Sequence, residues 1–268
     1  MIPNVLSIAG SDPSGGAGVQ ADLKTFCALG CYGMAALTAL TAQNTRGVSG
    51  LHAVPASFVA AQIDAIFADV RVDAVKIGML ASGEIVEAVA ARLRAHNARN
   101  IVLDPVLVAT SGDSLGAPDV VDAMKRSLIP LAAVITPNAP EAMRLADIAD
   151  VPRTAADLEA LARGLQALNP RAVLVKGGHL SGADAPDVLF DGSNVATFSA
   201  PRINTRNTHG TGCTLSSAIA AHLARGLDLK DAVAASKRYL SGALAASGAL
   251  SVGSGAGHGP VHHFHELW

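Results

Sequence analysis

The sequence contains few aromatic residues and almost no net charge. Aromatic residues make up 3% of its 268 residues, and the formal net charge at pH 7 is −2. Proteins that bind nucleic acid need clustered basic side chains to neutralise phosphates, and those that bind single strands add aromatic rings on which bases stack. The composition therefore argues against a nucleic-acid-binding protein.

The sequence also has no long apolar run, and its first residues do not predict a secretory leader. No run approaches the roughly 18 apolar residues of a membrane-spanning helix, and the N-terminal MIPNVLSIAG has neither a basic region nor a small-residue cleavage site. The cysteines are Cys27, Cys31 and Cys213, an odd number that cannot all pair within the chain. We therefore expect a cytoplasmic protein with free thiols and no membrane association. Cys27 lies beside Phe26 in a predicted helix, and we expect it to pack in the core.

Half of the residues are hydrophobic, and short apolar runs alternate with helical patterns. The apolar runs predict strands at 5–9, 33–39, 74–79, 100–108, 133–137 and 172–178. The helical patterns lie at 18–29, 56–69, 83–97, 118–128, 139–147, 155–168, 211–224 and 229–247. This alternation predicts an α/β fold with a central, mainly parallel sheet and helices on both faces. No linker or internal repeat divides the chain, so we expect one domain over residues 1–268.

Three further signals lie in the second half of the chain. Asp191-Gly192 separates two short apolar runs and predicts a hairpin over 186–201. Asp228 is the expected N-cap of the last helix. The C-terminal segment GAGHGPVHHFHELW, residues 255–268, reads as a loop. A loop does not hold metal ligands rigidly, so the four histidines of this segment are not assigned to a metal. They are His258, His262, His263 and His265.

Two signatures of nucleotide binding are incomplete or missing. Gly16-x-Gly18-x-x-Ala21 follows the first strand and opens a helix, as in dinucleotide-binding proteins. Those proteins also hold a ribose hydroxyl with an acidic residue after the next strand, and none occurs between Asp22 and Asp64. No GxxxxGK[ST] loop is present either. A nicotinamide enzyme is therefore disfavoured, and the glycine-rich segment remains either a ligand loop or a turn that packs helix against strand.

Polar side chains follow several of the predicted strands. Gln43 can donate and accept hydrogen bonds through its amide, so it could bind a heterocycle or simply occupy a turn. Lys176 could offer its ammonium to a phosphate or be an ordinary surface lysine. Asn138 and Glu141 have the spacing of a helix capping box, and the same side chains could orient Mg²⁺ through its waters.

The stretch NTHGTGC, residues 207–213, opens a predicted helix. Gly210 and Gly212 leave backbone N–H groups available to an anion, and Thr211 adds a hydroxyl. Cys213 falls in the first helical turn, where we expect the positive end of the helix dipole to lower the pKa of the thiol. A small buried hydrophobic residue, or half of a disulfide or metal site, is the alternative interpretation of Cys213.

The carboxyl ends of parallel strands lie at one edge of a sheet, so these groups should lie close together. Together they would provide an anion hole, a lysine, a possible Mg²⁺ relay and a group that binds a small polar ligand. That combination indicates phosphoryl transfer from a nucleotide, in which positioning and charge neutralisation do most of the catalysis.

Six motifs, in this order, resemble the hydroxymethylpyrimidine/phosphomethylpyrimidine kinases of thiamine biosynthesis. They are SIAGSDPSGGAGVQADLKTF, TALTAQNTRGV, LDPVLVATSGD, TPNAPEA, VKGGH and NTHGTGCTLSSAIA, and the tail GHGPVHHF matches as well. The resemblance covers the chain from about residue 5 to 265. It implies a three-layer ribokinase-like fold, ATP and Mg²⁺ as cofactors, and a homodimer. It also implies two successive phosphorylations of 4-amino-5-hydroxymethyl-2-methylpyrimidine, to the monophosphate and then to the diphosphate.

The resemblance further implies roles for particular residues. Cys213 stands where many ribokinase-like sugar kinases carry a catalytic Asp, and Gly210, Thr211 and Gly212 would form the anion hole beside it. Substrate would be bound by Gln43, Ala17, Asp22, Met79 and Val106. The ATP phosphates would meet Lys176, Thr208 and Lys237, with Asn138 and Glu141 near Mg²⁺ through water. The resemblance also includes Asp104.

Two other functions stay open at this point. A pyridoxal kinase, or a dual pyridoxal/hydroxymethylpyrimidine kinase of the same superfamily, also phosphorylates a hydroxymethyl group on a small heterocycle. The Gln43 amide suits an aminopyrimidine edge better. A non-catalytic pyrimidine-binding module would keep the fold, but it would not need Lys176, Glu141 and the GTGC sequence.

Overall fold

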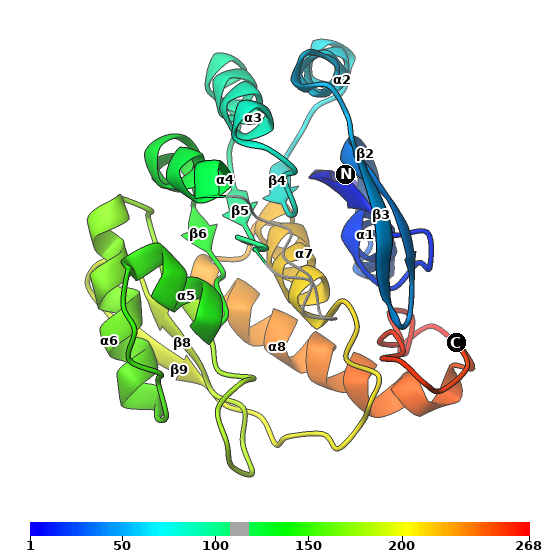
Figure 1. Ribbon diagram of the computed structural model, residues 1–268, viewed down its shortest axis with the longest axis vertical. Helices are drawn as coiled ribbons and strands as arrows, with labels where there is room; N and C mark the ends of the chain where they lie inside the picture. Colours follow the sequence, from blue (N-terminus) through cyan, green and yellow to red (C-terminus); the bar gives the residue numbers. More distant parts are fainter. Residues whose placement is uncertain (108–117) are drawn as a thin grey trace.

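The computed structural model describes residues 1–107 and 118–268, and within them it contains a nine-stranded sheet in the order β3-β2-β1-β4-β5-β6-β7-β8-β9. The strands are β1 (Asn4–Ser11), β2 (Tyr32–Asn44), β3 (Gly47–Ala53), β4 (Ala74–Ile77), β5 (Ile101–Leu103), β6 (Val134–Ile135), β7 (Val173–Lys176), β8 (Asp187–Phe190) and β9 (Val195–Phe198). The six central strands are parallel, whereas β3 at one edge and β8 and β9 at the other are antiparallel. The expected mainly parallel sheet is therefore confirmed (Figure 1).

Helices cover both faces of this sheet, as expected (Figure 1). They are α1 (Gly18–Ala28), α2 (Ala56–Asp69), α3 (Gly83–Ala95), α4 (Pro118–Ala123), α5 (Ala139–Ala146), α6 (Ala155–Leu165), α7 (Thr211–Ala224) and α8 (Leu229–Ala245). Short π and 3-10 turns continue α4, α6 and α8 at Met124–Leu128, Ile129–Leu131, Gln166–Leu168 and Ala246–Ala249. One apolar core lies under α2 to α6, and a second lies under α1, α7 and α8.

The central strands divide their side chains between the two cores. Leu6 and Ile8 of β1 pack in the core under α2 to α6, whereas Val5 packs in the opposite core. Alternate side chains of a strand point to opposite faces, and both faces are buried, so these strands read as continuous apolar runs. Lys76 of β4 departs from this pattern, as a lysine with no exposed surface in the middle of the sheet.

Local signals at the ends of elements were confirmed. Asp228 caps α8, and its side chain accepts the N–H of Asp231 at 2.9 Å. Asp191 begins the turn between β8 and β9 and accepts the N–H groups of Ser193 at 2.9 Å and Asn194 at 2.6 Å. Both carboxylates satisfy backbone donors that the helix or hairpin leaves unpaired.

The edge strand β3 was missed by the sequence analysis. It pairs with β2 through an antiparallel ladder and contains two glycines, a serine and a histidine. Four of its seven residues are exposed, and the other three are only partly buried. A strand without an apolar face carries no hydrophobic period, so its sequence reads as a loop.

The expectation that Cys27 packs in the core was wrong. Cys27 is exposed, whereas Cys31 beyond the end of α1 is buried. The buried face of α1 includes Asp22 and Thr25 beside Phe26. Because polar residues occur on the buried face of α1, its sequence has no clear apolar stripe. The sequence therefore does not show which side chains of this helix are buried.

The C-terminal tail packs against α7 and α8. His262 and His263 are buried, and Nε2 of His263 lies 3.1 Å from Oγ1 of Thr214 in α7. The hydroxyl of Tyr239 in α8 donates to the backbone carbonyl of His263 at 2.6 Å. Burial lowers the pKa of His263 to about 3, so this ring is neutral and structural.

Within residues 1–107 and 118–268, no helix is long and apolar enough to cross a membrane. The second half of the LDPVLVATSGD motif, residues 108–113, lies outside the described residues, as does the last position of the strand expected at 100–108.

Candidate active site

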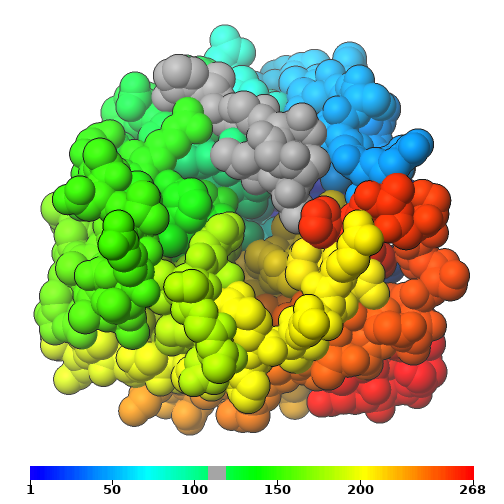
Figure 2. Space-filling model, turned by 60° about the horizontal axis from the view of Figure 1, so that its bottom comes forward, coloured from blue at the N-terminus to red at the C-terminus, as the bar shows by residue number. Residues whose placement is uncertain are grey.

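A cavity of about 730 Å³ opens where the parallel strands end. Figure 2 shows the molecule hollowed between its yellow-green and yellow segments, with the gold surface of α7 behind them. The lining includes most of the residues singled out from the sequence. They are Ala17, Gln43, Met79, Asp104, Val106, Asn138, Glu141, Lys176, Thr208, Gly210, Thr211, Gly212, Cys213 and Lys237. Thus strand ends distant in sequence meet at one place, as expected.

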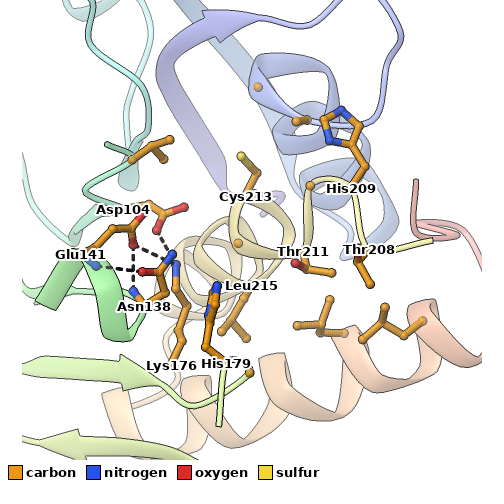
Figure 3. Close-up of a pocket in the computed structure, with 18 of the residues that line it drawn as sticks. Asp104, Asn138, Glu141, Lys176, His179, Thr208, His209, Thr211, Cys213 and Leu215 are labelled. Atoms are coloured by element: carbon orange, nitrogen blue, oxygen red, sulfur yellow. Dashed lines mark hydrogen bonds and ion pairs between the residues drawn. The ribbon is translucent and has the colours of Figure 1, made fainter. Parts of the chain in front are cut away.

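Lys176 is the centre of an acidic cluster in this cavity. Its Nζ donates to Oδ1 of Asp104 at 2.7 Å and lies 3.9 Å from Oε2 of Glu141 (Figure 3). Asp104 is buried and also accepts the hydroxyls of Thr136 at 3.2 Å and Ser216 at 3.3 Å. Burial raises the pKa of Asp104, but Lys176 and Lys76 hold it below its usual value, so the carboxylate stays charged.

Asn138 and Glu141 form the capping box of α5 that their spacing predicted. Oδ1 of Asn138 accepts the N–H of Glu141 at 2.9 Å, and Oε2 of Glu141 accepts the N–H of Asn138 at 2.8 Å. The same side chains line the cavity, so capping and cavity roles coexist. Burial raises the pKa of Glu141 to about 7, against the opposing effect of Lys176.

The donor set fits a magnesium ion held with its waters and substrate phosphates. Capping occupies the side-chain oxygen of Asn138 and Oε2 of Glu141 with short hydrogen bonds, which favours contact with the ion through water over direct coordination. Among the described residues there is no cluster of three His, Cys, Asp or Glu side chains that could enclose a metal. Mg²⁺ commonly keeps several waters and is bound by one or two carboxylates together with phosphates.

Lys237 approaches the cavity from α8. Its Nζ donates to Oδ2 of Asp187 and to the carbonyl of Ala185, each at 2.7 Å. Oδ1 of Asp187 accepts the N–H of Gly177 at 3.0 Å, which links Lys237 to the turn that follows Lys176. The two lysines therefore present positive charge to one cavity from different elements.

The start of α7 has the features expected of an anion site. Its N-cap Gly210 has φ of 77°, and a Cβ there would collide with the carbonyl oxygen of Gly16. Glycine is therefore required at this contact between two loops. No side chain in the described chain caps α7. The N–H of Thr211 donates to the carbonyl of Thr208 at 3.3 Å, which leaves the N–H groups of Gly212 and Cys213 available to a ligand. Thr211 faces the cavity, whereas Thr214 is buried against His263.

Cys213 lies in this first turn, between the Asp104–Lys176 cluster and His209 (Figure 3). The expectation of a lowered thiol pKa was wrong, because burial raises the pKa of Cys213 to about 11. Lys76 and the backbone N–H of Gly18 lower the pKa, but they do not offset the loss of hydration. The resting side chain is therefore a thiol at neutral pH.

Asp12 and His209 form a second pair of groups, which was not predicted from the sequence. Nε2 of His209 lies 2.7 Å from Oδ2 of Asp12, and both residues are buried in the cavity wall. Asp12 also accepts the N–H groups of Ser14 at 2.9 Å and Ala17 at 2.8 Å. This pair therefore ties the glycine-rich loop of residues 12–17 to the segment that precedes the anion site.

Lys76 is a further residue of the cavity that was not predicted from the sequence. Its Nζ lies 2.8 Å from both carboxylate oxygens of Asp22, and neither side chain has exposed surface. Lys76 lines the cavity, whereas Asp22, which the resemblance had placed in the substrate site, lies beneath the cavity lining. A lysine inside the apolar run AVKIGM was the signal in the sequence.

The remaining substrate candidates lie on the wall formed by the first strands and the loop after β5. Gln43 is partly buried, and its Oε1 accepts the hydroxyl of Thr41 at 3.1 Å. Ala17, Met79 and Val106 supply apolar surface to the same cavity. A flat ring between apolar side chains, with an amide at its edge, would fit such a wall.

The chain matches the phosphomethylpyrimidine kinase family over residues 12–262. It is 54% identical to the hydroxymethylpyrimidine/phosphomethylpyrimidine kinase of Salmonella typhimurium over 265 residues, which span 99% of this chain and 98% of that protein. It is 52% identical over 262 residues to a thiamine biosynthesis bifunctional protein of Geobacter sulfurreducens, spanning 97% of this chain and 52% of that protein. The pyridoxal kinase of Bacillus subtilis, solved as an ADP complex, has a TM-score of 0.88 and 36% identity, covering 98% of each chain.

These similarities bear on both the fold and the site. The structural likeness confirms the expected ribokinase-like fold. The family match spans the segments that carry Gln43, Lys176 and Cys213. The chain therefore belongs to the phosphomethylpyrimidine kinase family.

Proposed function

We propose that this protein is an ATP-dependent kinase of thiamine biosynthesis. It phosphorylates 4-amino-5-hydroxymethyl-2-methylpyrimidine to its monophosphate and then to its diphosphate. The observation that carries the proposal is one cavity lined by Gln43, by Lys176 and by the start of α7 with Cys213. A heterocycle bound at Gln43 would place its hydroxymethyl group toward Cys213, and the transferred phosphate would meet the helix N-terminus.

In the first reaction the substrate hydroxyl must lose a proton, and Cys213 is the candidate base. Backbone N–H groups at the start of α7 would stabilise the negative oxygens of the transferred phosphate. Lys176, held by Asp104 at 2.7 Å, and Lys237, held by Asp187 at 2.7 Å, would neutralise the ATP phosphates. Magnesium, reached through water from Asn138 and Glu141, would supply further positive charge to the phosphates.

In the second reaction the acceptor is the monophosphate. Its second pKa is about 6, so it is largely ionised near neutral pH and needs little help from a base. Two anions must instead be brought together, which makes the cationic side chains around the cavity more important than the thiol.

Pyridoxal phosphorylation is the second candidate activity, favoured by the structural likeness to a pyridoxal kinase. The higher identity to the Salmonella kinase and the Gln43 amide favour the pyrimidine.

The free state of all three cysteines supports the expected cytoplasmic location. The proposed homodimer would cover apolar side chains exposed on β2 and β3, which include Tyr32, Leu40 and Leu51.

Product analysis by mass tests the proposal. The protein is incubated with the hydroxymethylpyrimidine, ATP and Mg²⁺, with pyridoxal added in competition in a parallel reaction. A pyrimidine diphosphate is the expected product. Phosphorylated pyridoxal alone would establish the second candidate instead, and no phosphorylated product from folded protein would refute both.

Gln43 and its neighbour Asn44 provide a matched pair of variants. Gln43 lines the main cavity, whereas Asn44 is exposed and absent from its lining. Gln43→Ala should raise the KM for the pyrimidine by about tenfold, the cost of one lost hydrogen bond. Asn44→Ala should leave it unchanged. Equal effects of the two variants would contradict the assignment of Gln43.

A further inference from the structure

Lys76 is a buried cation that the proposed reaction does not use. It lies in the middle of β4, and its side chain has no exposed surface. Its neighbours Val75 and Ile77 point into the core under α2 to α6. Lys76 points to the opposite face, toward α1 and α7, where it forms part of the cavity lining.

Asp22 of α1 holds the ammonium of Lys76. Both carboxylate oxygens lie 2.8 Å from Nζ, and they also accept hydroxyls from Ser7 at 2.6 Å and Ser217 at 2.7 Å. Burial lowers the pKa of Lys76, but Asp22 raises it above its usual value. Lys76 is therefore an ammonium at every pH at which the enzyme would work.

Ser217 places this pair against the face of α7 that carries Cys213. The two residues are four positions apart in α7, so their side chains lie on the same face of the helix. Ser217 contacts Asp22, and Asp22 contacts Lys76, which places the ammonium below the first turn of α7. Lys76 and Cys213 both line the cavity, so no backbone layer separates them from the space that substrate would fill.

The charged groups that act on Cys213 come from four places. Lys76 of β4 is the strongest of them and favours the thiolate, whereas Asp22 of α1 and Asp104 after β5 disfavour it. Lys176 at the end of β7 also interacts with the thiol, but Asp104 holds its ammonium at 2.7 Å. Lys76 is thus the main positive group that opposes the effect of burial on this sulfur.

We propose that Lys76, held by Asp22, is a positioning residue of the first phosphorylation that acts by stabilising the thiolate of Cys213. This inference rests on the proposed function. The thiolate takes the proton of the substrate hydroxyl and becomes S–H. The hydroxyl oxygen forms a bond to the γ-phosphorus while the bond from phosphorus to the ADP oxygen breaks. The proton then leaves Cys213 for water, and the ammonium of Lys76 keeps its own protons throughout.

Alkylation of the thiols tests this role without any reference to kinase activity. The full chain is treated with iodoacetamide at pH 8.5, and modified Cys213 and Cys27 peptides are counted by mass over time. Only the thiolate reacts, so the rate at Cys213 follows its thiolate population. Cys27 is exposed on α1, so it serves as the reference thiol in the same tube.

Lys76→Met should slow alkylation of Cys213 about three- to tenfold relative to Cys27, since a smaller thiolate population is only partly offset by its greater nucleophilicity. Lys76→Met leaves the Asp22 carboxylate buried and unpaired, so Lys76→Met/Asp22→Asn is prepared as a second variant that keeps the fold. A loosened structure would expose Cys213 and speed its alkylation. Asp22 disfavours the thiolate, so the double variant should slow alkylation of Cys213 less than Lys76→Met does. An unchanged or faster rate in folded Lys76→Met would overturn the proposal.

A double-mutant cycle on the two half-reactions tests whether Lys76 acts through Cys213. Lys76→Met should slow the first phosphorylation about tenfold or more, and should add little to the loss in a Cys213→Ala background. A full additional loss in that background would show that Lys76 acts independently of the thiol, and would overturn the proposal. If Lys76→Met slows alkylation of Cys213 but the wild type has no kinase activity, Lys76 still stabilises the thiolate and the proposed function is refuted.

Discussion

Cys213 combines a position suited to catalysis with an environment that opposes ionisation. It stands in the first turn of α7 beside the candidate anion site, yet burial raises the pKa of its thiol to about 11. The thiolate population therefore grows with pH up to that value. If the thiolate is the base, the first phosphorylation should speed up as the pH rises from 7 to 10, whereas the second should change little.

Cys213→Ala should slow the first phosphorylation by about 10²–10⁴-fold, the usual worth of a general base, and should also abolish its rise with pH. The second phosphorylation should lose much less, because the monophosphate is already ionised. Separate assays of the two half-reactions measure both effects. Cys27→Ala, at an exposed thiol, is the matched control. Equal losses in both half-reactions would rule out the base role.

At the scale of elements, the cavity depends on a contact between two loops. His209 precedes α7, and Asp12 begins the glycine-rich loop that leads to α1. Besides their 2.7 Å hydrogen bond, the loops approach so closely that a Cβ on Gly16 would collide with the His209 ring. Burial raises the pKa of Asp12, but His209 and Ser14 hold it below its usual value. The Asp12 carboxylate therefore remains charged, and its hydrogen bond to His209 holds the two loops together.

His209→Ala should disturb the pyrimidine wall and the anion site together. It removes a hydrogen bond to a buried carboxylate, which is worth about 1.5–3 kcal/mol. We expect kcat/KM for the pyrimidine to fall about ten- to hundredfold, with both kcat and KM affected. His209→Gln keeps a donor and should recover much of the loss, and His52→Gln, at an exposed ring of β3 outside the cavity lining, should cost nothing. An unchanged kcat/KM in His209→Ala would show that the loops hold their places without this pair.

Most elements could be predicted because their apolar residues have a clear period. The strands β1, β4, β5, β6 and β7 are buried on both faces, and most of the helices have one apolar stripe. The edge strand β3 has neither and was missed. In the site, Gln43, Lys176 and Cys213 stand directly at strand or helix ends, where function is expected. The ion pair between Lys76 and Asp22 could not be predicted from the sequence, because these residues are 54 positions apart and meet only when α1 packs against the folded sheet.

Burial and neighbouring charges determine the protonation states of the site residues more than their positions at helix or strand ends do. The helix N-terminus at Cys213 predicted a reactive thiol, but loss of hydration dominates there and reverses the shift of its pKa. Each lysine of the cavity is matched with a carboxylate: Lys76 with Asp22, Lys176 with Asp104 and Lys237 with Asp187. Such pairing lets cations remain charged inside the molecule, ready for anionic substrates.

At the scale of the whole molecule, buried neutral histidines should make the fold sensitive to acid. His222 of α7 is 7% exposed, and neither ring nitrogen has a hydrogen-bond partner among the described residues. Burial lowers its pKa from 6.5 to about 4. Below pH 6.5 the unfolded chain therefore binds a proton that the folded chain does not bind until about pH 4, so stability falls across this interval.

His222→Leu removes the titrating ring while keeping an apolar side chain of similar size. Between pH 7.5 and pH 5 the wild type should lose about 2 kcal/mol of unfolding free energy through His222, at about 1.4 kcal/mol per pH unit of displaced titration. The variant should lose correspondingly less over the same interval in urea unfolding followed by circular dichroism. His52→Gln, at an exposed ring of β3, should show the full wild-type loss. An identical pH dependence in His222→Leu and wild type would place the acid sensitivity elsewhere, with buried His263 the next residue to replace.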